Sequence, residues 1–398
     1  MIMLILMLEF VIFIITCVLS LDNGLARTPP MGWITWQRYQ CQFNCSEYPN
    51  DCINEKLVKH IADKLILDGW NNLGYRYVII NDCWSTRQRD SKTNELIADH
   101  EKFPKGIQSV VQYVHSKNLL FGIYLDYGTK TCSSYPGSMD YLEVDAKSVA
   151  KWKVDYVKMD KCNSPVGIQP EGFQNFSRLL NVTGRRIVFS CGYPANVSWL
   201  KNPNLNDWNR LPESCNSWRI LDDVEESWTS VFNIINAYIL GNKVIPQLAG
   251  PGHWNDPDVL LMSSFGLPDV QKRVQFGLWC MFAAPLLIAT DMDKLDDFSV
   301  SLLRNKQLLA IDQDKGGHQA EFVKTRNYVQ MWIRQLDDNP VGWAIACFYT
   351  IASGKAIYFH TSLSEFKSQL YAIFGDYFEL TDVFTGGTFK EVGLMRNL

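Results

Sequence analysis

The chain has 398 residues, of which 47% are hydrophobic and 20% charged, and its net charge is −4. This length can bury a large core and is sufficient for two domains. A slightly acidic chain has no general attraction for nucleic acid, so we expect no nucleic-acid partner. The 13 Trp and 17 Tyr residues are compatible with sugar binding, although aromatic side chains also fill cores.

The N-terminal segment, residues 1–20, is almost entirely apolar and ends in the small residue Ser20. This pattern predicts a signal peptide over 1–20, with the mature chain beginning near Leu21. The run lacks a basic start and is interrupted by Glu9, so an uncleaved membrane anchor is the alternative.

Cysteines and glycosylation sequons support a secretory protein, either lysosomal or secreted. Eight cysteines in the first half of the mature chain lack the paired C-x-x-C spacing of zinc sites, so we expect disulfides. They are Cys41, Cys45, Cys52, Cys83, Cys132, Cys162, Cys191 and Cys215. Cys280 and Cys347 lie in apolar runs and are expected to be buried thiols. N-glycans are predicted at Asn175, Asn181 and Asn196, and less so at Asn44, whose sequon contains a cysteine.

Short apolar segments alternate with segments of helical period along the first three quarters of the chain. The expected strands are 31–36, 75–84, 119–128, 154–162, 186–192, 217–223, 244–250 and 285–291. The expected helices are 55–70, 106–117, 143–152, 170–180, 226–240, 268–284 and 297–310. Eight β/α units predict an α/β fold, a (β/α)8 TIM barrel over residues 21–314. An open doubly wound sheet is the alternative, but the sequence has neither a GxGxxG nor a Walker loop.

The pattern changes in the last quarter of the chain, which has no long helical segment. Short segments rich in Tyr, Phe, Ile and Val are separated by turn residues such as Gly386-Gly387. They lie at 328–334, 343–351, 355–361, 368–374 and 377–384. We therefore predict a C-terminal all-β domain over 315–398, an antiparallel β-sandwich.

Polar residues gather at the ends of the predicted strands. In a parallel barrel, the carboxyl ends of the strands form the mouth of the active site. The strand over 154–162 ends in Lys158 and Asp160, and a carboxylate there could act as a nucleophile; Asp160 could equally cap a following helix or pair with Lys158. The other such residues are Trp36, Asn81, Asp82, Tyr124, Asp126, Arg219, Asp222, Asp223, Asp256 and Asp258, each of which could instead be a cap or loop residue.

The residue types at these ends favour glycoside hydrolysis. That reaction requires two acids, one attacking the anomeric carbon and one protonating the departing oxygen. Lys158 is positioned to lower the pKa of a nucleophilic Asp160. The six histidines form no HExxH motif and no GxSxG motif is present, so we expect neither a metal nor a cofactor.

Several long motifs carry a resemblance to a known family. They are LDNGLARTPPMGW (21–33), NDCW (81–84), FPKGI (103–107), GIYLDYGTKTC (122–132), VDYVKMDKC (154–162), CNSWR (215–219) and AGPGHWNDPDVL (249–260). On these motifs the chain resembles glycoside hydrolase family 27, the animal lysosomal α-galactosidases and α-N-acetylgalactosaminidases. The resemblance implies a retaining exo-glycosidase that removes terminal α-linked galactose or N-acetylgalactosamine from glycoconjugates, and a homodimer.

The resemblance also implies roles for individual residues. Asp160 would be the nucleophile and Asp223 the acid/base. Substrate would be bound by Trp36, Asn81, Asp82, Tyr124, Lys158, Gly192, Ala195, Arg219 and Asp258. The implied disulfides are Cys41–Cys83, Cys45–Cys52, Cys132–Cys162 and Cys191–Cys215.

Substrate choice depends on Gly192 and Ala195. These positions carry Glu and Leu in α-galactosidases, and Ser and Ala in α-N-acetylgalactosaminidases. Two small residues leave room for an N-acetyl group and weaken the preference for plain galactose, although Gly192 lacks the serine hydroxyl. We expect N-acetylgalactosamine to be accepted and galactose to be turned over as well; a strict α-galactosidase is the alternative.

Three residues depart from the family pattern. Asn81 replaces an aspartate and loses its charge. Lys161 replaces a glycine, so it would be strained if that backbone requires a positive φ, and its ammonium could reach Asp160. Val259 replaces a methionine. The first two departures support a second alternative, a weakly active or inactive sugar-binding protein.

Overall fold

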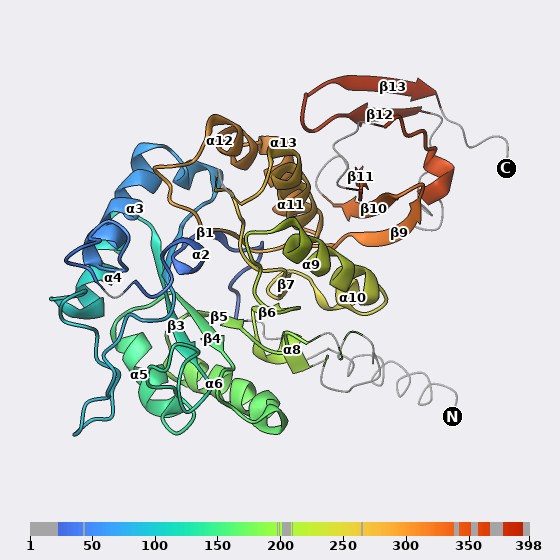
Figure 1. Cartoon of the computed structure of the whole chain (residues 1–398). Coiled ribbons are helices and arrows are strands. Elements are labelled where there is room, and N and C mark those ends of the chain that lie inside the picture. The colour runs from blue at the N-terminus through green and yellow to red at the C-terminus, as the bar shows by residue number, and fades with distance from the viewer. Residues whose placement is uncertain are drawn as a thin grey trace, which may run out of the picture.

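The computed structural model describes residues 23–337, 342–351, 357–366 and 377–392, apart from residues 43, 197, 199, 201–207, 209 and 264–265. The predicted signal peptide lies outside these ranges. The larger part is an α/β barrel, and antiparallel sheets follow at the C-terminal side of the chain (Figure 1).

Eight parallel strands form the barrel, as predicted. They are β1 (Met31–Ile34), β2 (Tyr77–Ile80), β3 (Leu120–Asp126), β4 (Tyr156–Asp160), β5 (Val188–Cys191), β6 (Ser217–Arg219), β7 (Trp254–Asp256) and β8 (Leu286–Ile288). Their order is β7-β6-β5-β4-β3-β2-β1-β8. Leu260, which follows β7, forms a parallel bridge with Ile288 of β8 and thereby closes the ring.

Helices surround these strands (Figure 1). The longer ones are α3 (Glu55–Leu67), α4 (Gly106–Ser116), α5 (Leu142–Lys151), α6 (Gln169–Val182), α9 (Trp228–Leu240), α11 (Asp269–Met281), α12 (Asp297–Leu303) and α13 (Lys306–Asp312). The shorter ones are α2 (Trp36–Tyr39), α8 (Arg210–Ser214), α10 (Ile245–Leu248), η1 (Asn71–Leu73), η2 (Val166–Ile168) and η3 (Leu363–Phe366). In α3 the side chains spaced by four residues, Leu57, Ile61 and Leu65, are buried, and Asn54 caps the helix by accepting the Leu57 N–H at 2.8 Å.

The prediction of a strand over 244–250 is wrong. The segment contains α10, and the seventh strand is Trp254–Asp256. Pro246 lies in the first turn of α10, where its missing N–H costs no hydrogen bond, whereas in a central strand it would remove one from the sheet. The true strand is short and contains two polar residues, so its apolar signal is weak.

The C-terminal region is antiparallel, as predicted. Its strands are β9 (Glu321–Arg326), β10 (Val329–Leu336), β11 (Gly342–Tyr349), β12 (Tyr377–Thr381) and β13 (Thr388–Val392). They form a three-stranded sheet, β11-β10-β9, and a two-stranded sheet, β12-β13. Of the expected strand over 355–361, the described part, 357–361, is not a strand, and the expected strand over 368–374 lies outside the described residues. The boundaries 21–314 and 315–398 remain a prediction.

The three-stranded sheet packs on the barrel through β10. The ring of Trp332 meets that of Phe282 edge to face at 5.2 Å, and Phe282 stacks on Tyr238 of α9 at 4.0 Å. Arg334 donates a hydrogen bond to the carbonyl of Cys280 in α11. These contacts make β10 part of the barrel's apolar periphery.

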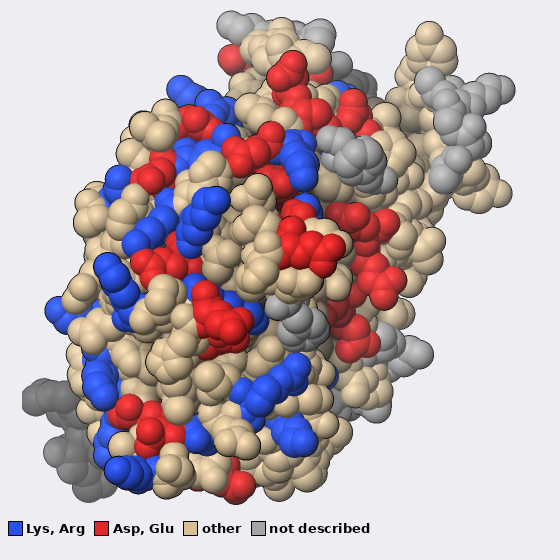
Figure 2. Space-filling view, turned by 60° about the vertical axis from the view of Figure 1, so that its left-hand side comes forward, with Lys and Arg blue, Asp and Glu red and all other residues tan. Residues whose placement is uncertain are grey.

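The surface carries charges of both signs. On the face shown in Figure 2, basic and acidic side chains are interspersed. Within the described ranges, no helix combines the length and the apolarity needed to cross a membrane.

Candidate active site

The polar residues predicted at strand ends meet at one end of the barrel. In the register of β3 and β4, Tyr124 pairs with Lys158 and Asp126 with Asp160. In the register of β6 and β7, Arg219 pairs with Asp256. Because all of these strands are parallel, their carboxyl ends share one rim, which is where a barrel binds its substrate.

Asp160 ends β4 and is held on both oxygens. Its Oδ2 accepts the Tyr124 hydroxyl at 3.2 Å, and its Oδ1 accepts the Lys161 N–H at 2.9 Å. Burial raises the pKa of the Asp160 carboxyl, although the nearby Lys158 ammonium opposes the shift. The next helix, η2, begins only at Val166, so Asp160 is not its cap.

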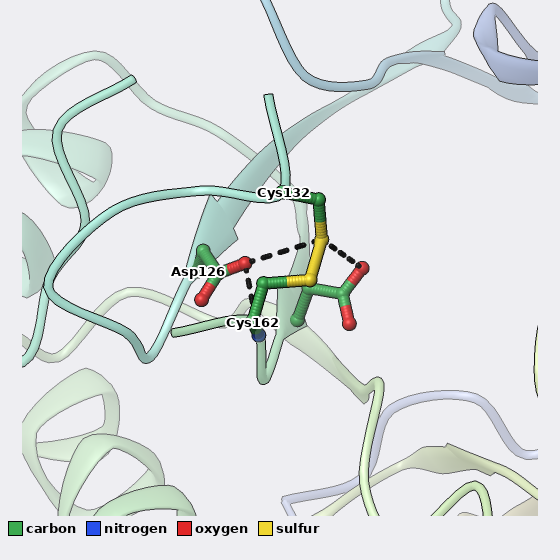
Figure 3. Close-up of side chains that lie close together, drawn as sticks. Asp126, Cys132 and Cys162 are labelled. Carbon is green, nitrogen blue, oxygen red and sulfur yellow. Dashed lines mark hydrogen bonds between the residues drawn. A yellow bond between two sulfur atoms is a disulfide. The ribbon is translucent and has the colours of Figure 1, made fainter. Parts of the chain in front are cut away.

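Asp126 is a second acid beside Asp160, at the end of its own strand β3, and no role was predicted for it. Its side chain is buried, and its Oδ2 accepts the same Tyr124 hydroxyl at 3.2 Å. Figure 3 shows Asp126 next to the Cys132–Cys162 disulfide. Burial, followed by the charge of Asp160, raises the pKa of Asp126 to about 8, so this carboxyl is protonated at acidic pH.

This cluster resembles a metal site in its composition but not in its chemistry. One ligand atom each from Asp126, Cys132, Asp160 and Cys162 lie within 4.8 Å of one another. The two sulfurs are joined in a disulfide, so neither is available as the thiolate that binds a metal. The cluster is therefore better described as a carboxylate, that of Asp160, packed against a disulfide than as a metal centre.

Asp223, the predicted partner of Asp160, lies beyond the end of β6 and pairs with Arg219. The Arg219 Nη1 donates to Asp223 Oδ1 at 2.9 Å, and its Nη2 lies 3.1 Å from Asp258 Oδ2. Burial would raise the pKa of Asp223, but Arg219 and then Lys158 hold it below its ordinary value. The Asp223 side chain is 56% exposed, whereas Arg219 is buried.

The other predicted pocket residues lie around these two acids. Asp82 follows β2 and accepts the Ser133 N–H on Oδ2 at 3.1 Å, and Asn81 accepts the Asp82 N–H at 3.0 Å. An aspartate could accept that bond too, so the Asn81 departure preserves this contact. Trp36 opens α2 and is half-buried, which leaves part of its ring free to contact a ligand. Lys158 is buried, and no described residue binds its ammonium by a hydrogen bond or ion pair.

The segment Gly192–Ala195 lies against the nucleophile's strand. The Gly192 N–H donates to the Met159 carbonyl at 2.7 Å, and the Ala195 N–H donates to the Arg219 carbonyl at 3.0 Å. A Cβ at Gly192 would lie 2.7 Å from Asp160 Oδ1. The space expected at Gly192 is therefore taken up by the Asp160 carboxylate, and Ala195 is a small, buried residue.

Lys161 shows neither the backbone strain nor the contact between its ammonium and Asp160 that were considered for it. It is not among the residues with positive φ, so its backbone is not strained. Its ammonium does not bind Asp160; Nζ donates to the carbonyls of Pro194 at 2.7 Å and Ala195 at 3.1 Å. This contact could not be predicted from the residue pattern, because it depends on how the chain turns after β5.

Four disulfides link the pairs that the family resemblance implied: Cys41–Cys83, Cys45–Cys52, Cys132–Cys162 and Cys191–Cys215. Cys280 is a free buried thiol, as expected, whereas the free Cys347 is exposed. The three sequon residues, Asn175, Asn181 and Asn196, are all exposed, as a glycan requires.

Known proteins are similar to this chain in sequence and in fold. A sequence profile of the family described as alpha galactosidase A matches residues 28–314. The α-N-acetylgalactosaminidase of Gallus gallus is 40% identical over 368 residues, which cover 92% of this chain and 88% of that protein. Human α-galactosidase A is 40% identical over 328 residues, 82% of this chain and 75% of that protein. The crystal structure of α-galactosidase I from Mortierella vinacea superposes with a TM-score of 0.82 at 28% identity, covering 93% of this chain and 94% of that one.

Proposed function

Because the chain belongs to the alpha galactosidase A family of glycoside hydrolases, we propose that it hydrolyses terminal α-linked N-acetylgalactosamine and, as a second substrate, terminal α-linked galactose. The observation that carries this proposal is the placement of Asp160 and Asp223 at one rim of the barrel, with Lys158 and Arg219 beside them. Two carboxyl groups with separated environments are what glycoside hydrolysis needs.

The mechanism proceeds in two steps with retention of configuration. Asp160 attacks the anomeric carbon, and the glycosidic bond breaks as Asp223 gives its proton to the departing oxygen. The resulting glycosyl–Asp160 ester is then hydrolysed by a water from which Asp223 takes a proton. Tyr124 and the Lys161 N–H hold the attacking carboxylate in place.

In the free enzyme the pKa of Asp160 is raised and that of Asp223 is lowered, whereas the first step needs the acid/base to have the higher pKa of the two. Substrate binding supplies the correction. Asp223 is 56% exposed, so a bound aglycone removes water from it and raises its pKa. The two acids interact and their apparent pKa values belong to the pair, so one proton shared by the pair is sufficient for the reaction.

The remaining residues would bind the sugar. Lys158, whose ammonium is buried without a described partner, and Asp82 would hold hydroxyls, and Trp36 would stack on the ring. Ala195 leaves room for a 2-acetamido group, and Gly192 offers no side chain to a 2-hydroxyl. Asn81, Tyr124, Arg219 and Asp258 complete this proposed set.

The cellular setting follows from the same family. We propose a secretory-pathway enzyme, lysosomal or secreted, in which four disulfides and exposed sequons are compatible with an oxidising compartment. A homodimer is part of this proposal.

The activity is tested with two aryl glycosides at acidic pH, the α-N-acetylgalactosaminide and the α-galactoside. Turnover of both, with the higher kcat/KM for the acetamido substrate, is the expected result. A large preference for the galactoside would contradict the specificity proposal. Binding of either sugar without turnover would instead support the alternative based on the Asn81 and Lys161 departures, a sugar-binding protein without activity.

A further inference from the structure

The side chain of Lys161 adds a contact between the end of β4 and the loop after β5, two elements that a backbone hydrogen bond already joins at Gly192. Lys161 follows the last residue of β4, and its own N–H donates to Asp160 Oδ1 at 2.9 Å. Its half-buried side chain reaches across to the loop after β5, where Nζ donates to the Pro194 and Ala195 carbonyls. One residue therefore contacts both the nucleophile and the wall beside it.

The ammonium is the only described side chain that donates to these two carbonyls. Backbone hydrogen bonds hold the segment at its ends, from Gly192 to Met159 and from Ala195 to Arg219. An ammonium has three donors and no acceptor, so it is suited to gathering carbonyl oxygens that point to one spot. Hydrogen bonds from a charged donor are stronger than neutral ones, so this link fixes the C-terminal end of the segment, at Pro194 and Ala195.

The chemistry of the reaction places the sugar's 2-substituent beside this segment. Asp160 attacks C1, and the 2-substituent is on the adjacent carbon. Gly192 lies so close that a Cβ would be 2.7 Å from Asp160 Oδ1. A group attached next to the attacked carbon must therefore lie near the chain that leads from Gly192 to Ala195.

We propose that Lys161 is a positioning residue that sets the sugar specificity, by tying the segment Gly192–Ala195 to the end of β4. This inference rests on the proposed function and extends it. The larger acetamido group contacts more of the wall than a hydroxyl does, so its binding depends more on where the wall is held. Loosening the segment thus weakens binding of the acetamido substrate more than that of the galactoside.

The test compares Lys161→Met, which keeps the length of the side chain but removes the ammonium, with Lys161→Arg, which keeps the charge. The ratio of kcat/KM for the aryl α-N-acetylgalactosaminide over the aryl α-galactoside is expected to fall about tenfold in the Met variant, chiefly through KM of the acetamido substrate. The Arg variant is expected to restore most of the ratio. Lys147→Met, at an exposed lysine on α5, is the matched control and leaves the ratio unchanged.

An equal loss of kcat/KM for both substrates in Lys161→Met would overturn the proposal, because the lysine would then support only the fold or the chemical step. Thermal unfolding identifies a variant that does not fold, and Lys161→Gln then provides the same comparison with a neutral donor. If the wild-type enzyme hydrolyses neither glycoside, the proposed function fails. Calorimetric binding of free N-acetylgalactosamine and galactose to the wild type and the Met variant then tests the role of Lys161 without turnover.

Discussion

The ends of β4 and β6 hold their acids in opposite ways. Asp160 is enclosed between Tyr124, the Lys161 N–H and the Cys132–Cys162 disulfide, and burial raises its pKa. Asp223 is mostly exposed, and its pairing with Arg219 contributes to a pKa below the ordinary value.

An enclosed acid has a fixed position, whereas an exposed acid can respond to what binds over it. A nucleophile must meet one carbon at one distance, so enclosure suits Asp160. An acid/base must change its protonation state during each turnover, so a site whose solvation depends on the substrate suits Asp223.

The largest expected effect is the loss of turnover on replacing Asp160, the enclosed acid. Asp160→Asn keeps the shape of the side chain but removes the attacking carboxylate, so turnover of both aryl glycosides should fall on the order of 10⁴-fold or more. Steady-state kinetics measures the loss, and circular dichroism checks that the fold is intact. A folded Asp160→Asn protein with near wild-type turnover would show that another residue is the nucleophile.

A smaller loss of turnover, which depends on the substrate, is expected on replacing Asp223, the exposed acid. Asp223→Asn removes the acid/base, which contributes about 10²–10⁴-fold in rate. Aryl glycosides whose phenols leave without protonation should keep a faster first step than alkyl glycosides. Kinetics with a series of phenols measures this difference, and the same loss for every leaving group would contradict the role of Asp223.

A shift in pH dependence is expected from removing Lys158, whose charge acts on both acids. Lys158 lowers the pKa of Asp160 and of Asp223, opposing burial at both. In Lys158→Met both pKa values rise, so the ionised nucleophile is lost at a higher pH as the pH falls, and the protonated acid persists to a higher pH. The bell-shaped profile of kcat/KM should move upward by about one pH unit. The Lys147→Met control should keep the wild-type profile.

The smallest effect on turnover is expected at Asp126, because the proposed reaction does not use this residue. Its expected effect is on the pH dependence of stability. Its folded-state pKa is about 8 against an ordinary 3.8, so the folded protein holds this proton more tightly than the unfolded chain. The stability it contributes is full below the unfolded pKa and is lost as pH rises toward about 8. Asp126→Asn should flatten the fall in the free energy of unfolding over this interval, measured by denaturant titration at several pH values. An unchanged slope would mean that another group carries the dependence.

Much of the fold could be predicted from the sequence, because barrel strands buried on both faces are apolar runs and the helices between them bury one side. The seventh strand escaped because Trp254–Asp256 has three residues, two of them polar, while the nearby apolar run contains Pro246. At the site, position alone placed acids at the strand ends, but it did not distinguish a nucleophile from a helix cap, and the roles came from the family resemblance. The contacts of Lys161 and the raised pKa of Asp126 could not be predicted, since both depend on the loops after β3 and β5.

The two disulfides near the acids differ in access to solvent. Cys191–Cys215 is fully buried beside Gly192, whereas Cys132 is exposed and Cys162 half-buried two residues after Asp160. A thiol in solution can reach an exposed sulfur and not a buried one. Mild reduction should therefore break Cys132–Cys162 before Cys191–Cys215 and lower activity while the barrel remains folded. In this chain, activity should therefore be lost under milder reducing conditions than those that unfold the barrel.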